Sequence, residues 1–182
     1  SYIWSNGATT QSIVVSTSGN FTVAAINASG CTSAVSAATS VVVNPIPALP
    51  TITASGATTF CDGGSVTLTA PAGAANYIWS NGASGRSIVA NTSGNYSVSI
   101  VSAAGCTSAV SAATSVTVNP IPAQPSVSAG GATTFCTGGS VTLTATGGTN
   151  YIWSNGATTP SITVNTAGSY SARVISAGCT SV

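Results

Sequence analysis

Residues 77–82 read Tyr-Ile-Trp-Ser-Asn-Gly, and the same six residues stand at 2–7 and at 151–156. The three copies begin 75 and 74 residues apart. Asn-Pro-Ile-Pro-Ala, starting at 44 and 119, and Gly-Ala-Thr-Thr-Phe-Cys, ending at 61 and 136, recur with the same spacing. Self-similarity at a fixed period indicates a structural unit repeated along the chain. We predict three parts: the C-terminal strands of one repeat (1–47), a complete repeat (48–122) and a repeat lacking its last strand (123–182).

Within the complete repeat, apolar and hydroxyl side chains alternate with a period of two, which is the pattern of half-buried strands. The clearest runs are Ser-Val-Thr-Leu-Thr at 65–69 and Tyr-Ser-Val-Ser-Ile at 96–100. Glycine-containing turn signals separate the runs, and no segment keeps a 3.6-residue period, so we expect no helix. The pattern predicts an all-β chain of tandem immunoglobulin-like antiparallel β-sandwiches. The two Pro-Ile-Pro segments, at 45–47 and 120–122, predict short, semi-stiff connectors between them.

Charge is almost absent from the chain. Arg86, Arg173 and Asp62 are its charged residues, and there is no His, Lys or Glu. General acid–base catalysis needs such groups close together, and these three lie in different stretches. We therefore expect no catalytic residue, no cofactor and no enzymatic activity. Two Arg are also too few for a basic patch, so we expect no nucleic-acid partner.

The remaining composition argues against a membrane span, disorder and a metal site. Ser and Thr interrupt every apolar run long before the length of a spanning helix. Disordered chains combine low hydrophobicity with high net charge, whereas this chain is 43% hydrophobic with a net charge of +1. Calcium prefers several carboxylates, but the turn at Asp62 holds one, and Thr137 takes its place in the next repeat.

Four segments carry a resemblance to a known group of proteins. They are Phe-Cys-Asp-Gly-Gly-Ser-Val-Thr-Leu-Thr at 60–69, Tyr-Ile-Trp-Ser-Asn-Gly at 77–82, and Gly-Asn-Tyr-Ser-Val at 94–98 followed by Gly-Cys-Thr at 105–107. The chain resembles the Ig-like and PKD-like repeats of very large surface proteins in gliding and other Bacteroidetes bacteria, over essentially its whole length. The resemblance implies a tandem array in a secreted bacterial adhesin or filament, often exported by the type IX route. In antibody-type domains the second Cys lies two residues beyond the strand-F Tyr, whereas Cys106 lies ten beyond Tyr96, so their disulfide geometry does not carry over.

The aromatic residues have two interpretations each. Trp4, Trp79 and Trp153 could form an exposed row that stacks on sugars, but each sits on an alternating strand, which favours a place in the core. Tyr96 and Tyr170 could contact a ligand. We favour corner tyrosines that bury the ring and anchor the hydroxyl.

Five Cys without His and without C-x-x-C spacing predict disulfides, and hence an oxidising compartment. One register keeps the bridges within units, as Cys61–Cys106 and Cys136–Cys179, with Cys31 paired to a Cys upstream of a sequence that we expect to be part of a longer protein. The other register crosses the connectors, as Cys31–Cys61 and Cys106–Cys136. We favour the first, because extended strands and a connector would hold the second pairs tens of ångströms apart. A strict Ig topology would place Cys61 and Cys106 at opposite ends of the sandwich, but the short link from Trp79 to Ile88 suggests that fewer strands intervene, which could bring both cysteines to one end.

The leading hypothesis is a non-catalytic structural segment of an extracellular filament or surface-adhesin stalk, whose partners are neighbouring repeats or copies of the same protein. A glycan- or surface-binding module and the spacer repeats of a large secreted hydrolase are the alternatives. Binding loops should differ in composition from the scaffold, but the turns here are as repetitive as the strands. That observation favours the structural role.

Overall fold

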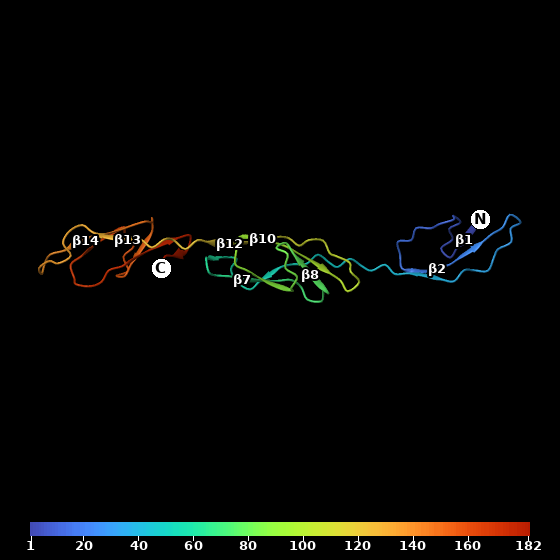
Figure 1. Ribbon diagram of the computed structural model, residues 1–182, viewed down its shortest axis with the longest axis horizontal. Coiled ribbons are helices and arrows are strands. Elements are labelled where there is room, and N and C mark those ends of the chain that lie inside the picture. The colour runs from blue at the N-terminus through green and yellow to red at the C-terminus, as the bar shows by residue number, and fades with distance from the viewer.

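The computed structural model describes residues 1–182 and contains strands, turns and loops but no helix (Figure 1). The predicted all-β fold is confirmed. Three bodies lie in a row in chain order, which we name the N-terminal segment (1–47), the central unit (48–122) and the C-terminal unit (123–182). The C-terminus of the chain folds back to the junction with the central unit (Figure 1).

The central unit is a two-layer sandwich. Its strands are β5 (Thr53–Ala54), β6 (Thr59–Cys61), β7 (Val66–Thr69), β8 (Asn76–Trp79), β9 (Ser87–Ala90), β10 (Gly94–Tyr96), β11 (Val98–Val101) and β12 (Thr114–Asn119). One layer has the order β5-β7-β9. In the other layer β8 pairs with β11. The strand β10, which leads into β11, pairs with β12, and β12 pairs in turn with β6. All pairs are antiparallel except β6 with β12, which run parallel.

The core of the central unit lies between these layers. It contains ten buried side chains, drawn equally from both layers: Val66, Leu68, Ala70, Tyr77, Trp79, Ile88, Ala90, Tyr96, Val98 and Val116. The period-two pattern produces this arrangement, because alternate side chains of a strand point to opposite faces. The hydroxyl residues between them face outward; for example, Thr69 and Ser87 hydrogen-bond across β7 and β9 at 2.9 Å.

The C-terminal unit repeats this plan with fewer strands, because the segments that match β6 and β10 form none. Its strands are β13 (Ser126–Ala129), β14 (Val141–Thr146), β15 (Tyr151–Trp153), β16 (Ser161–Val164), β17 (Ala172–Ser176) and β18 (Cys179–Thr180). They form the layers β13-β14-β16 and β15-β17-β18, with eight buried side chains between them. No strand stands at the place that β12 occupies in the central unit.

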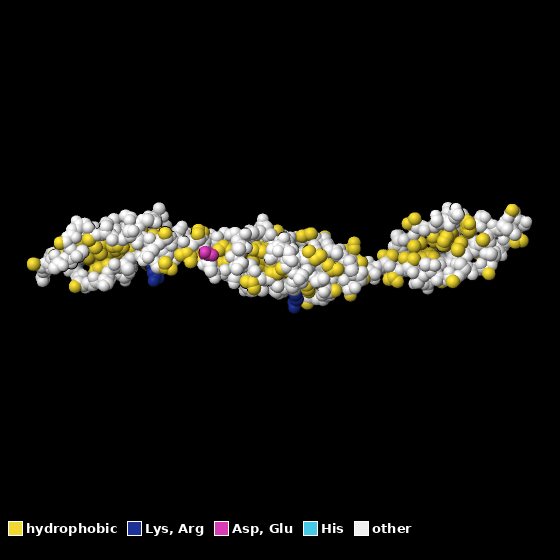
Figure 2. All heavy atoms as spheres, viewed as in Figure 1, with side chains coloured by type: hydrophobic (Ala, Val, Ile, Leu, Met, Phe, Trp, Pro, Cys, Tyr) yellow, Lys and Arg dark blue, Asp and Glu magenta, His cyan; other side chains and the backbone are white.

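The N-terminal segment has one layer. Its strands are β1 (Tyr2–Trp4), β2 (Gly19–Phe21), β3 (Val23–Ala25) and β4 (Thr39–Val41), paired as β1-β3 and β2-β4. They match β8, β10, β11 and β12 of the central unit in sequence. Without a second layer the apolar face is uncovered, and Figure 2 shows apolar side chains gathered in the middle of this body. Tyr2 is 36% exposed, whereas the matching Tyr77 of the two-layered central unit is 8% exposed.

Serine side chains cover the outer edge of β11. The segment after the hairpin, Ser-Ala-Val-Ser at 108–111, is not a strand, but the N–H groups of Ser108 and Ser111 donate to Ile100 O and Val98 O, both at 2.9 Å. In return, the N–H of Val98 donates to Ser111 Oγ at 3.1 Å, and that of Ile100 to Ser108 Oγ at 3.0 Å. The same Ser-Ala-Val-Ser motif at 33–36 covers β3 in the N-terminal segment. An exposed strand edge is thereby satisfied without charged residues.

This arrangement makes Ser111 a stability determinant. We expect Ser111→Ala to lower the free energy of unfolding of the central unit by about 1–3 kcal/mol, because the N–H of the fully buried Val98 loses its acceptor. Urea denaturation measures the change. Ser84→Ala, at an exposed serine with no hydrogen bond in the structure, is the control and should change stability by less than about 0.5 kcal/mol. Equal effects of the two substitutions would contradict the edge-covering role.

Candidate functional site: the bridged joint

A disulfide joins the central unit to the C-terminal unit. Cys61 ends β6, and Cys179 begins β18, 118 residues further along the chain. Their Cα atoms lie 5.6 Å apart, within the range that a disulfide requires. The bridge therefore spans the connector at 120–125, which belongs to no strand.

Asn119 stands at the centre of this joint. Its carbonyl oxygen accepts a hydrogen bond from the N–H of Asp62 at 2.8 Å and lies 3.8 Å from the Sγ of Cys179. Its side-chain amide donates to Ala177 O of the C-terminal unit at 3.0 Å. One residue thus contacts both ends of the bridge, and the joint is held by a covalent bond and a hydrogen bond as well as by the connector.

The parallel pairing of β6 with β12 brings Cys61 to the joint. Asn119, the last residue of β12, is opposite Cys61 in the ladder, so Cys61 lies where the chain leaves the central unit. A tight turn follows, with the N–H of Gly64 donating to Cys61 O at 2.9 Å. A Cβ on Gly64 would come within 2.9 Å of the Phe60 ring and 3.0 Å of Cys61 O, which is why the turn needs glycine there.

The β17–β18 hairpin brings Cys179 to the same place. Ala177 and Gly178 form its two-residue loop with φ of 49° and 80°, and positive φ at both central positions is typical of a type I′ turn. The corresponding hairpin of the central unit has three residues between Ser102 and Cys106. The shorter loop in the C-terminal unit imposes a left-handed conformation on Ala177, whose carbonyl accepts the bond from Asn119.

The predicted pairings Cys61–Cys106 and Cys136–Cys179 are wrong, because Cys61 and Cys179 are bonded to each other. Cys106 lies at the opposite end of the central unit, where its Sγ is 3.7 Å from Asn44 O of the N-terminal segment. The segment from Gly94 to Val101, which forms β10 and β11, extends between the two ends of the unit over roughly 23 Å at 3.3 Å per residue. The antiparallel sandwich therefore keeps in-unit pairs apart, while the end-to-end arrangement brings cysteines of neighbouring units together.

The other three cysteines are free in the structure. Cys31 and Cys136 are exposed and Cys106 is half-buried, and the pairing of Cys31 with a cysteine upstream of the sequence stays a prediction. No group of three or more His, Cys, Asp or Glu side chains is close enough to hold a metal ion. The structure contains no helix that is long and apolar enough to span a membrane.

The aromatic residues lie as follows. Trp79 and Trp153 are each 2% exposed, and their indole N–H groups donate to Gly85 O at 2.7 Å and Thr159 O at 2.8 Å. Trp4 makes the matching bond to Thr10 O but is half-buried, because the N-terminal segment has only one layer. The hydroxyls of Tyr96 and Tyr170 donate to the carbonyls of Thr92 at 3.0 Å and Thr166 at 3.1 Å. Tyr96 is buried, whereas Tyr170 borders an open groove.

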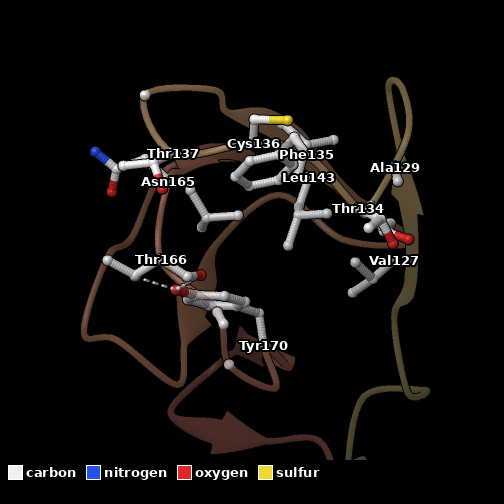
Figure 3. A pocket seen from close by; sticks show the side chains of 16 residues that line it. Val127, Ala129, Thr134, Phe135, Cys136, Thr137, Leu143, Asn165, Thr166 and Tyr170 are labelled. Carbon is white, nitrogen blue, oxygen red and sulfur yellow. Dashed lines mark hydrogen bonds between the residues drawn. The ribbon is translucent and has the colours of Figure 1, made fainter.

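This groove, of about 750 Å³, is lined by residues of the C-terminal unit (Figure 3). Phe135, Leu143 and Tyr170 point into it from different segments of the unit (Figure 3). By sequence they correspond to Phe60, Leu68 and Tyr96, which pack in and around the core of the central unit beside β12.

The groove therefore lies where a strand equivalent to β12 would pack in the C-terminal unit. In the central unit, β12 lies between β10 and β6 and inserts Val116, which is 2% exposed, into the core. In the C-terminal unit the matching segments, 168–170 and 134–136, flank the groove and form no strands. The absence of a strand matching β12 explains the lining of the groove without a ligand.

Sequence reasoning missed Asn119, Ala177 and the serines that cover β11. One signal was present for the hairpin: Cys106 follows Tyr77 by 29 residues, whereas Cys179 follows Tyr151 by 28. A repeat shortened by one residue just before its cysteine indicates a changed turn at that position.

Comparisons with known proteins do not assign a function to the chain. No protein-family model matches the chain, and no curated protein sequence matches it. Among solved structures, the human OSCAR ligand-binding domain is similar, with a TM-score of 0.35 and 19% sequence identity over 76% of this chain and 96% of that one. A likeness at that TM-score carries no argument about function.

The strained position in the joint hairpin gives a prediction. Ala177→Asn should raise the free energy of unfolding by up to about 1 kcal/mol, because Asn tolerates the left-handed conformation better than Ala, and Asn-Gly is the preferred type I′ pair. Urea denaturation of the oxidised protein tests this. Ala104→Asn, in the three-residue hairpin where no alanine has positive φ, should give no gain. A loss of stability in Ala177→Asn would contradict the turn assignment.

The groove gives another prediction. A copy of residues 110–122 appended after Val182 should fold into the groove, bury the side chain that matches Val116 and partly bury the one that matches Val118. It should stabilise the C-terminal unit by a few kcal/mol, at about 1.5–3 kcal/mol for each fully buried valine. Hydrogen exchange should slow at 168–170 and 134–136. The same extension with both valines replaced by Ser is the control. Unchanged exchange at both segments would show that the groove is not a strand site.

Proposed function

We propose that the chain is a non-catalytic structural segment of an extracellular filament or surface stalk, in which disulfide bridges across the joints hold successive sandwich units in line. The observation that carries the proposal is the Cys61–Cys179 bridge between two units. Its partners would be neighbouring repeats or further copies of the same protein. Disulfides persist in oxidising compartments, which supports a location outside the cell.

The joint has the contacts that a stalk requires. Flexible linkers let neighbouring domains reorient, but here a hydrogen bond from Asn119 and a disulfide restrict the same joint. The Pro-containing connector adds stiffness of its own, because proline fixes φ. A force applied to the ends of the chain would pass from β6 through the bridge to β18 instead of along the residues between them.

The surface supports the same role. Figure 2 shows charged side chains only as isolated spots on a surface of polar and apolar groups. Hydroxyl side chains on the outward strand faces solvate the sheets, so solubility does not depend on charge. With so few charges, contacts along and between units should change little with ionic strength.

Glycan or surface binding is less well supported. The buried positions of Trp79 and Trp153 leave them unavailable to stack on a sugar. The one large groove corresponds to a strand position of the central unit, so its aromatic residues have a structural explanation.

Single-molecule extension tests the proposal. Pulling the oxidised chain from its two ends should release a contour length shorter by roughly 400 Å than for the reduced chain, because the 118-residue separation closed by the bridge cannot extend at about 3.3–3.6 Å per residue. Optical-trap or atomic-force measurements resolve this difference.

The matched control is the variant with both Cys61→Ser and Cys179→Ser, which should give the longer length with or without reductant. Equal lengths for the oxidised wild-type chain and this variant would mean that force does not pass through the bridge, and the proposed role would then lose its main support.

A further inference from the structure

The first joint connects the N-terminal segment to the central unit, and the second, bridged joint connects the central unit to the C-terminal unit. Cys106 occupies the same place at the first joint as Cys179 does at the second. The Sγ of Cys179 lies 3.8 Å from Asn119 O, and the Sγ of Cys106 lies 3.7 Å from Asn44 O. Asn44 and Asn119 are equivalent residues, since each begins an Asn-Pro-Ile-Pro-Ala connector. The half of the joint contributed by the following unit is therefore arranged alike at both joints.

The other half of the first joint lacks a cysteine. At the second joint Cys61 reaches Asn119 because β6 lies along one edge of β12. In the N-terminal segment, β4 pairs with β2 along one edge, and no strand lies along the edge that corresponds to β6. The place that Cys61 would occupy beside Asn44 is accordingly open to a strand.

We propose that Cys106 is a bridging site for a second inter-unit disulfide, whose partner is a cysteine that ends a β6-type strand, Thr-Thr-Phe-Cys, added to the free edge of β4. The geometry requires a strand parallel to β4 that ends opposite Asn44. This site lies apart from the observed bridge, and it implies that one disulfide closes each joint in succession. Cys136, at the end of the segment that matches β6, is the complementary half for a unit that would follow.

The bond forms by thiol–disulfide exchange. The two protein thiols give up two protons and two electrons to a disulfide oxidant, such as oxidised glutathione, which is reduced to two thiols. A mixed disulfide on either cysteine is the intermediate, and the second thiolate displaces the small thiol from it. Half-burial of Cys106 beside Asn44 favours attack by a strand held at that edge over attack by a free thiol.

The decisive experiment adds a copy of residues 48–75 directly before Ser1, which supplies the segments that form β5, β6 and β7 in the central unit and one cysteine, the copy of Cys61. The extended chain is folded in a glutathione redox buffer, alkylated, digested without reduction and analysed by mass spectrometry. We expect a peptide that links the added cysteine to Cys106, together with the Cys61–Cys179 peptide, and two free thiols instead of the three in the present chain.

The controls are the same extension with its added cysteine replaced by Ser, and the extension carrying Cys106→Ser. Each should retain the Cys61–Cys179 bridge, and the first should keep three free thiols. A link from the added cysteine to Cys31 would overturn the proposal in favour of pairing within a unit. An unlinked Cys106 in an otherwise folded extension would overturn it as well.

A second measurement uses the chain without extension. The probe is a peptide copying residues 55–64, whose cysteine is activated as the mixed disulfide with thionitrobenzoate. It should react with Cys106 faster than with Cys31, although the thiol of Cys31 is the more exposed of the two. Transfer that follows exposure would count against the site. The inference rests on the proposed stalk, but its failure is distinguishable, because the length change on reduction depends on Cys61 and Cys179 alone.

Discussion

The parallel pairing of β6 with β12 is the constraint on which the joint depends. Every other strand pair in the central unit is antiparallel, and antiparallel pairs place successive turns at alternate ends of the sandwich. Because β6 runs alongside the last strand in the same direction, Cys61 comes to the end at which the chain departs for the next unit. The bridge, the contact with Asn119 and the alignment of the two units all follow from that one ladder.

The bridge also bears on stability, because each unit has a small core. Ten buried side chains in one unit and eight in the other are few, and small domains commonly need disulfides in addition to a core. In the chain-entropy model, closing a loop of this length disfavours the unfolded state by about 5 kcal/mol. Since the loop includes parts of both units, the two are expected to unfold less independently than units joined by a connector alone.

Much of the fold could be predicted from the sequence, because it depends on local periodicity. The alternation of apolar and hydroxyl residues at 65–69 and 96–100 predicted strands, and the structure has strands there. Trp79 and Trp153 lie in the core at the strand positions where the pattern placed them. The disulfide could not be predicted in this way. Its register depends on which end of a sandwich each cysteine reaches and on how the next unit is placed, and neither quantity is contained in the local pattern around Cys61. The role of Asn119 is hidden for the same reason, because its partner Ala177 belongs to another unit.

The closed loop changes what a broken peptide bond would do. Proteases cut preferentially at exposed loop tips with small residues, and the hairpin at 103–105 is such a tip. A single cut there, or at any other bond between Cys61 and Cys179, leaves two fragments that remain covalently joined through the bridge. After a single cut inside the loop, separating the two ends of the chain takes reduction of the bridge, so the molecule can be nicked there once without being shortened.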